Sequence, residues 1–235
     1  MKHLPALVVL LLAPVAGLCA PAGPGSGPRL AALSSAAPRT GFEIDALLEH
    51  LARPAPSSTP FLEAHFSALL IRPLVVGGTL EYLGPGSLAR TVTEPYHERA
   101  EVRGDTVTLE RDGEPAQQFS LDRVPALRSL LASFTALLGG NVAALERQFR
   151  LDLHGDAARW TLGLTPRDPQ IHQRIRAITV SGSGFDLRCL TTFQANGDVT
   201  VTLVSAAARA RLPAAPDRAW FAAECRGSHA RTGEP

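Results

Sequence analysis

The chain has 235 residues, 45% of them hydrophobic, with 23 Lys and Arg against 22 Asp and Glu. A chain of this length and apolar content can bury one large core, which excludes a chain that is disordered throughout. A net charge of +1, without a basic stretch that carries interleaved aromatic residues, argues against nucleic acid as a partner.

The first 22 residues have the three-part layout of a secretory signal peptide. Residues 1–3 are a short basic start, residues 4–15 are almost wholly apolar, and Ala20 and Ala22 have the spacing of a small-x-small cleavage site. The apolar run is shorter than the ~20 residues that cross a bilayer. We therefore expect residues 1–22 to direct secretion and to be removed, leaving a soluble chain.

The three cysteines leave two questions open. Cys19 lies at the end of the apolar run, where a cysteine can serve as a lipid attachment site, although Leu18 stands where such sites have a small residue. Cleavage after Ala22 removes Cys19 and leaves Cys189 and Cys225. In an oxidising compartment these two either form a disulfide or remain buried as small apolar side chains.

A flexible leader and a short helix follow the signal peptide. Residues 23–40 consist mainly of Pro, Gly, Ala and Ser, a composition typical of a mobile linker. Residues 43–53 then place four apolar side chains at helical spacing, and Pro54 and Pro56 end this helix. At the other end of the chain, we expect residues 209–235 to form a C-terminal helix and a tail.

Most of the chain between these ends has the pattern of short strands. In residues 62–70, Leu62 and Phe66 share a face that alternates with Glu63 and His65, which predicts a strand with one buried and one wet face. Further strands are expected at residues 79–82, 88–92, 97–102, 106–111, 118–121, 150–153, 159–164, 177–180, 186–193 and 199–204. The segments are separated by turn residues, of which Asn196-Gly197 is the strongest hairpin signal.

Two predicted helices interrupt the strands. The first covers residues 127–138, where large apolar side chains make a broad face. The second covers residues 142–149 and has Asn141 as its N-cap.

These elements predict an α+β fold that is mainly β. Ten or eleven strands joined by tight turns form one antiparallel sheet, and a twisted sheet of that size curls toward a barrel. The helices are amphipathic enough to cover the apolar face of the sheet. The inner face is then either a packed core or a cavity, and a helix as apolar as residues 127–138 favours a lid over an apolar interior.

Motifs for catalysis and metal binding are missing from the sequence. The histidines lack the spacing of a helical zinc site, no Gly-rich loop ends in Gly-Lys-Ser/Thr, and no Cys-x-x-Cys occurs. Residues 180–184 join two predicted strands instead of a strand and a helix, so we interpret Ser183 as part of a hairpin turn. The sequence thus predicts neither an enzyme nor a cofactor, which favours a binding protein.

Four segments resemble the LolA family of periplasmic carriers of outer-membrane lipoproteins. Residues 78–95 (GTLEYLGPGSLARTVTEP) are similar to the family's Gly-x-Leu…Pro…Phe/Leu-x-Trp…Pro hairpin, and residues 104–107 (GDTV) follow where it has an Asp-Gly turn. Residues 160–166 (WTLGLTP) resemble a later strand that ends in Leu-x-Pro, and residues 178–197 resemble the final hairpins. The order and spacing of these segments extend the resemblance over about residues 41–206.

The resemblance implies a fold and a function. The family fold is an incomplete antiparallel β-barrel with helices as a movable lid, which we place at residues 41–208. It implies a monomeric periplasmic carrier that holds an acylated lipoprotein or lipid in a hydrophobic cavity, between an inner-membrane donor and an outer-membrane acceptor. Two positions depart from the family: Gly84 stands where an arginine helps to hold the lid shut, and Arg90 replaces an aromatic residue. These departures leave the gating and the cargo open.

On this interpretation the hydrophobic cavity and the lid can be assigned to residues. The cavity is expected to be lined by Leu62, Phe66, Leu80, Tyr82, Trp160 and Leu162, and the lid to be formed by Leu127, Leu130, Leu131, Phe134 and Leu138. For each of these residues, ordinary core packing is the alternative.

Two other functions stay open at this stage. A module of the same fold, anchored to a membrane through Cys19, would act as a receptor or structural protein and bind protein instead of lipid. A hydrolase that acts through Ser183 is the third hypothesis.

Overall fold

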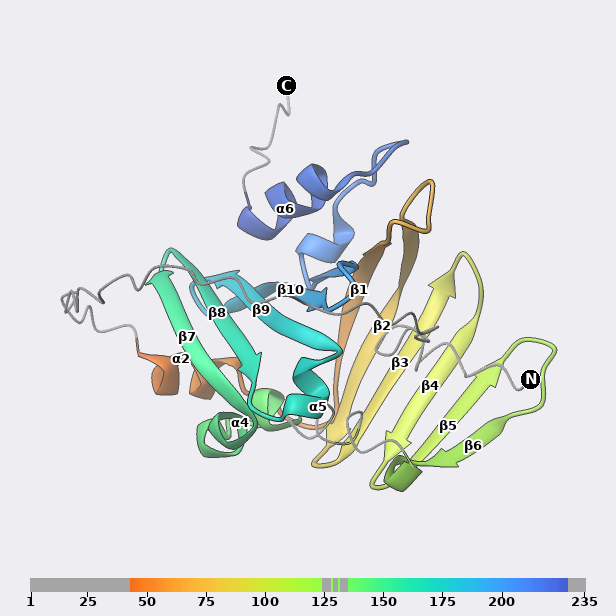
Figure 1. The fold of residues 1–235 in the computed structure, drawn as a ribbon, viewed down its shortest axis with the longest axis horizontal. Helices are drawn as coiled ribbons and strands as arrows, with labels where there is room; N and C mark the ends of the chain where they lie inside the picture. Colours follow the sequence, from red (N-terminus) through yellow and green to blue (C-terminus); the bar gives the residue numbers. More distant parts are fainter. Residues whose placement is uncertain (1–42, 124–127, 129–130, 132–134, 228–235) are drawn as a thin grey trace, which may run out of the picture.

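The computed structural model describes residues 43–123, 128, 131 and 135–227. Within these residues, eleven strands form one antiparallel sheet, with short helices on both of its faces (Figure 1). The strands are β1 (Ser57–Phe66), β2 (Leu74–Gly84), β3 (Ser87–Glu94), β4 (Glu98–Arg103), β5 (Thr106–Arg111), β6 (Gln117–Ser120), β7 (Phe149–Asp156), β8 (Arg159–Pro166), β9 (Ile175–Ser183), β10 (Asp186–Gln194) and β11 (Val199–Val204). The helices are α2 (Ile44–Leu51), α4 (Val142–Gln148), α5 (Pro169–His172) and α6 (Arg218–Arg226), with the 3-10 turns η1 (Leu121–Arg123) and η2 (Ala207–Arg209).

The sheet consists of two runs of hairpins. Strands β1 to β6 are successive antiparallel neighbours, strands β7 to β11 are as well, and the runs join where β1 pairs with β11. The two edge strands are β6 and β7, so the sheet is open, and its strong curvature gives it a concave and a convex face (Figure 1). The prediction of one antiparallel sheet of ten or eleven strands, curled into an incomplete barrel, is therefore confirmed.

Helices α2 and α4 cover part of the concave face. Leu47 and Leu48 of α2 and Leu145 of α4 are almost fully buried in one cluster with β8 and β9. The predicted N-cap of α4 is confirmed: the Asn141 side chain accepts a hydrogen bond from the Ala144 N–H at 2.9 Å. Among the helices of the described chain, none has the length and apolar content of a membrane span.

Helix α6 packs on the convex face, across β1, β10 and β11. Phe221 of α6 is fully buried in a cluster with Ala64 of β1 and Leu203 of β11. The Asp217 side chain accepts a hydrogen bond from the Trp220 N–H at 2.7 Å and caps the start of the helix. Helix α6 therefore covers the apolar convex side of β1 and β11.

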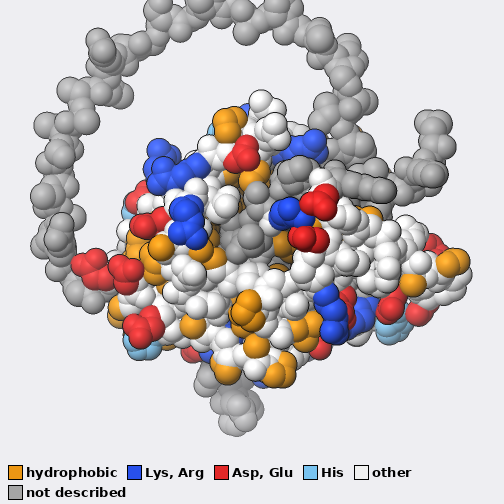
Figure 2. All heavy atoms as spheres, turned by 90° about the horizontal axis from the view of Figure 1, so that it is seen from below, with side chains coloured by type: hydrophobic (Ala, Val, Ile, Leu, Met, Phe, Trp, Pro, Cys, Tyr) orange, Lys and Arg blue, Asp and Glu red, His pale blue; other side chains and the backbone are white. Residues whose placement is uncertain are grey.

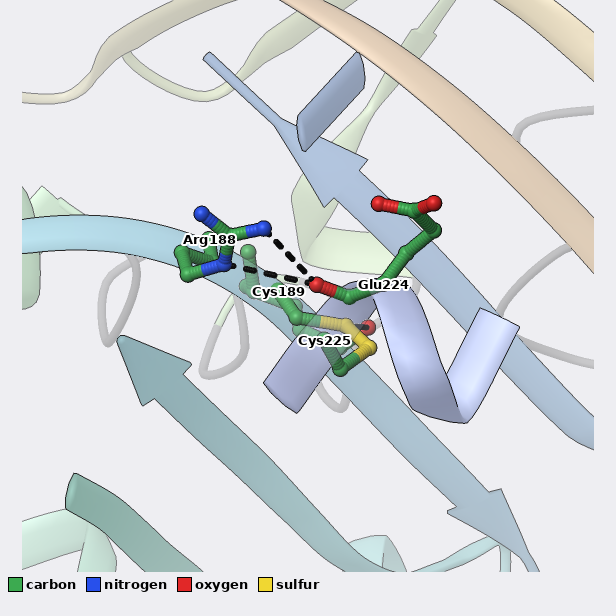
Figure 3. The surroundings of a disulfide bond; sticks show 5 residues. Arg188, Cys189, Glu224 and Cys225 are labelled. Atoms are coloured by element: carbon green, nitrogen blue, oxygen red, sulfur yellow. Dashed lines mark hydrogen bonds between the residues drawn. A yellow bond between two sulfur atoms is a disulfide. The ribbon is translucent and has the colours of Figure 1, made fainter. Parts of the chain in front are cut away.

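A disulfide and two hydrogen bonds fasten α6 to β10 (Figure 3). Cys189 is bonded to Cys225, with their Cα atoms 5.2 Å apart, so the open question about this cysteine pair is answered by a disulfide. The Arg188 guanidinium donates to the Glu224 carbonyl oxygen from Nε at 3.3 Å and from Nη2 at 3.0 Å. The β9–β10 register shifts between Leu187 and Cys189, and this bulge lets two consecutive residues reach α6.

Strand β1 begins and ends earlier than predicted. It covers Ser57–Phe66, whereas residues 67–70, which were expected to continue the strand, form a turn. The segment before Leu62 has no alternating pattern, but Ser57 pairs with Tyr82 and Pro60 with Thr79, so the neighbouring strand extends it. Tertiary pairing therefore overrides the local pattern at both ends of this strand.

Candidate functional site

The strand register assigns each predicted lining residue to a face of the sheet. Leu80 and Tyr82 of β2 lie on the concave face, together with Trp160 and Leu162 of β8. Trp160 and Leu162 are 1% and 0% exposed, in the cluster that α2 and α4 cover. The Trp160 indole N–H donates to the Gly184 carbonyl oxygen at 2.8 Å. These two β8 residues are therefore part of a packed core in this structure.

Leu62 and Phe66 lie on the convex face, so their assignment to the same lining is wrong. Side chains alternate along β1, and Leu62 is paired with Leu203 and packs with it under α6. The Phe66 ring meets the Phe221 ring edge-on, with the centroids 5.8 Å apart. The alternation did mark a buried face of β1, but the helix that buries it lies on the opposite side of the sheet from the concave surface.

The predicted lid is described only in part. Leu127, Leu130 and Phe134 lie outside the described residues. Leu131 is half-buried and packs against a cluster of β4 and β5. The Leu138 carbonyl oxygen accepts a hydrogen bond from the Arg53 N–H at 2.9 Å, which ties the end of this segment to the residues that follow α2. The described part thus lies at the concave face.

Large apolar side chains remain partly exposed on the concave face on both sides of the packed core. They come from β2 and β3, from β6, and from the edge strand β7: Leu80, Leu88, Phe119, Leu151 and Leu153. In the view from below, hydrophobic side chains form several small groups separated by charged side chains and by backbone and other side chains (Figure 2). We call these five side chains the concave rim.

A row of ion pairs runs along the concave face from β1 to β5. Arg90 of β3 donates from Nη2 to Glu63 Oε1 at 2.9 Å, and its Nη1 lies 3.9 Å from Glu98 Oε1. Arg111 of β5 donates from Nε to Glu98 Oε2 at 2.7 Å, and the Thr202 hydroxyl donates to Glu63 Oε2 at 2.7 Å. Glu63 and Glu98 are only 6% and 3% exposed. Two carboxylates and two guanidiniums compensate each other, so the row carries no net charge.

This row was not predicted from the sequence, because the alternating pattern of β1 placed Glu63 on a solvent-exposed face. Glu63 was assigned to a wet face because it alternates with apolar neighbours, whereas the structure turns it to the concave face, where Arg90 balances its charge. Arg90 was noted only as the replacement of an aromatic residue. Its guanidinium carbon lies 4.8 Å from the centroid of the Phe61 ring, so the arginine still packs on an aromatic surface. Charged residues at inward positions of neighbouring strands were the available signal.

Tyr96 lies next to this row, in the connection between β3 and β4. Partial burial raises the pKa of its hydroxyl, and the carboxylate of Glu98 raises it further, while Arg90 and Arg111 act in the opposite direction. Tyr96 therefore senses the charge state of the row. In the part of the chain that the structure describes, no group of three His, Cys, Asp or Glu side chains is arranged to hold a metal ion.

Comparison with known proteins gives a family and a set of distant structural similarities. The sequence model described as "Outer membrane lipoprotein carrier protein LolA-like" matches residues 36–227. No curated protein gives a significant match. A LolA superfamily protein from Nitrosomonas europaea is 10% identical, with a TM-score of 0.39 over 69% of this chain and 90% of that one. A DUF1329 family protein from Desulfovibrio piger is 10% identical, with a TM-score of 0.32 over 77% of this chain and 95% of that one.

Proposed function

Because the chain belongs to the family of LolA-like outer membrane lipoprotein carriers, we propose that it is a non-enzymatic carrier of acyl chains. It holds the acyl chains of lipoproteins or lipids against the concave face and moves them through the periplasm toward the outer membrane. The observation that carries this proposal is the concave rim, whose five large apolar side chains stay partly exposed beside a packed core.

Burial of an acyl chain on this rim would provide the binding energy. Each methylene removed from water is worth about 0.8 kcal/mol, so a chain of ordinary length is held firmly by apolar contact alone. No step of this binding needs a nucleophile, an acid or a metal. The ion-pair row is already compensated within the protein, so an acyl chain that lies beside it leaves no carboxylate unpaired.

The carrier role sets the expected partners and location. The cargo is an acylated lipoprotein or a lipid, received from an inner-membrane donor and released to an outer-membrane acceptor. Residues 1–22 would direct export to the periplasm, and the protein would work as a monomer. Leu131 and Leu138 belong to the segment that we expect to cover the bound acyl chain.

Fluorescent fatty-acid binding to matched variants tests this function. Leu80 lies on the concave rim, and its neighbour Thr79 lies on the convex side of the same strand. We expect Leu80→Gln to weaken binding by roughly tenfold, because it replaces one apolar contact by a polar one, and Thr79→Gln to leave binding unchanged. Circular dichroism of both variants checks the fold. Equal affinity of the Leu80→Gln variant and the unmodified protein would place the acyl chain elsewhere.

A further inference from the structure

The hairpin tip between β1 and β2 is the most apolar exposed segment of the described chain. Leu69 is 93% exposed, Leu70 43%, Ile71 103% and Leu74 42%. Among the described residues, only Tyr96, Phe185, Phe193 and Leu212 are other exposed large apolar side chains, and each of them is less than half exposed. Contiguous exposed apolar side chains of this kind mark an interaction site.

The tip is an ordered turn that directs its side chains outward. The Leu70 N–H donates to the Ser67 carbonyl oxygen at 3.1 Å, and the Leu69 N–H donates to Ser67 Oγ at 3.3 Å. Turns usually consist of Gly, Pro, Asn, Asp and Ser because these residues fit turn backbones or cap them. Leu69 and Ile71 neither favour a turn backbone nor cap it, and their side chains are almost fully exposed to solvent. Their apolar character therefore requires an explanation outside the folded chain.

The charges around the tip are positive. A recess of about 400 Å³ beside it is lined by Leu70, Ile71 and Phe66 and by Arg72 and Arg218, and no Asp or Glu is among its lining residues. The Arg218 guanidinium lies 5.5 Å from the centroid of the Phe66 ring, at the base of the hairpin. The hairpin thus combines protruding aliphatic side chains with two arginines, and Figure 1 shows it at one margin of the sheet, near the start of α6.

We propose that this tip, residues 69–72, inserts into the surface of a bilayer that contains anionic phospholipids. Protruding Leu and Ile side chains enter the acyl region at the boundary of the head groups, and arginines beside them pair with lipid phosphates. A protein partner would favour aromatic anchors in a packed interface, whereas the outermost residues here are aliphatic. This inference goes beyond the proposed carrier function, and acyl binding at the concave rim does not depend on it.

Vesicle flotation of the full-length protein tests the proposal. The probes are vesicles of phosphatidylethanolamine with phosphatidylglycerol, and vesicles of phosphatidylcholine alone. The test variant is Leu69→Glu with Ile71→Glu, and the control is Ala116→Glu with Gln117→Glu, which adds the same charge at exposed positions by β6. Every protein carries the same leader, so any contribution of residues 1–22 is constant.

The proposal predicts that the unmodified protein and the control float with the anionic vesicles, and that the tip variant binds them roughly tenfold or more weakly. Arg72→Gln with Arg218→Gln should remove the preference for anionic over zwitterionic vesicles. Flotation of the tip variant equal to that of the control would overturn the proposal, as would absence of flotation for the unmodified protein. A concentration-dependent dimer that the tip variant abolishes, without vesicle binding, would identify a second copy as the occupant instead.

Two further measurements are needed. Tryptophan quenching distinguishes insertion into the bilayer from attachment to its surface, and fatty-acid binding distinguishes the membrane contact from the carrier function. Tryptophan in Ile71→Trp should be quenched by lipids brominated on their acyl chains, whereas tryptophan in Ala116→Trp should not; equal quenching in both would contradict insertion. Fatty-acid binding should be the same in the tip variant and the unmodified protein. Failure of flotation alone would therefore leave the carrier function standing, and loss of fatty-acid binding alone would leave the membrane contact standing.

Discussion

Glu63 tests the ion-pair row at the scale of a single residue. Replacing it by Ala removes the partner of Arg90 and leaves that guanidinium beside Glu98 at 3.9 Å. Breaking a buried charge pair on one side typically costs about 3–5 kcal/mol, so we expect Glu63→Ala to lower the free energy of unfolding by an amount near that range, measured by urea denaturation.

The matched control is Arg103→Ala, which removes an ion pair with Glu101 on the exposed side of β4. Its side chain is 73% exposed, and exposed pairs contribute about 0–1 kcal/mol. Equal, small effects of the two variants would show that the row is not held as a buried network.

Tyr96 provides a pH-dependent readout of the same row. Burial and the carboxylate of Glu98 raise its pKa above the ordinary value of 10.0. The unfolded chain therefore loses the Tyr96 proton at lower pH than the folded chain does, and the contribution to stability falls as the pH rises from about 10 toward the raised pKa.

The phenolate absorbance of the unmodified protein minus that of Tyr96→Phe measures this titration. We expect a midpoint above 10.0. We further expect Glu98→Gln to lower the midpoint without returning it fully, because burial is the larger cause. A difference titration centred at or below the ordinary value would contradict this environment for Tyr96.

The sequence predicted correctly which residues of β1 share a face of the strand, but not which face of the sheet they lie on. The alternation of Leu62 with Glu63 correctly separates two faces of a strand. The alternation cannot tell which of the two faces is concave, because side chains on both faces are buried. Leu62 is buried under α6, and Glu63 is buried in the ion-pair row. Leu80 and Tyr82 lie on the concave face, and the polar Thr79 and Glu81, which alternate with them, lie on the convex side.

At the scale of elements, the disulfide that links α6 to β10 contributes to the stability of the fold. The disulfide closes a loop of 36 residues and so lowers the entropy of the unfolded chain, an effect worth about 3–4 kcal/mol of stability. We expect Cys189→Ala with Cys225→Ala to lower the free energy of unfolding by about this amount. Urea denaturation of the unmodified protein with and without dithiothreitol provides the control, since reduction should reproduce most of the effect. An unfolding curve that does not respond to reduction would argue against the bond.

The elements themselves were largely predictable because each has a local cause. Tight turns with Gly and Asn-Gly separate the strands, and Asn141 marks the start of α4. The short helix α5 was not predicted: Asp168 caps it and Pro169 begins it, but four residues are too few to show a periodic pattern. The early start of β1 was missed for a different reason, since only its pairing with β2 makes that segment a strand.

At the scale of the whole molecule, the curvature of the sheet gives each residue its role. An open sheet of eleven strands is strongly curved (Figure 1), and helices α2 and α4 cover β8 and β9 on its concave face. This arrangement makes a packed core of Trp160 and Leu162 but leaves the concave rim partly exposed. The sequence predicted the number of strands and their places along the chain, but not the pairing of β1 with β11. It could not predict which part of the apolar surface is filled by helices, because that depends on contacts between segments far apart in the chain.

Acyl species that stay with the protein through purification test the carrier function most directly. The full-length protein is to be produced in a bacterium with an outer membrane, purified without detergent, extracted with organic solvent and examined by mass spectrometry. Our account predicts acyl chains in amounts comparable to the protein, and much less of them with Leu80→Gln than with Thr79→Gln. A protein that carries no acyl species, and takes up no fluorescent fatty acid when it is offered, would contradict the account.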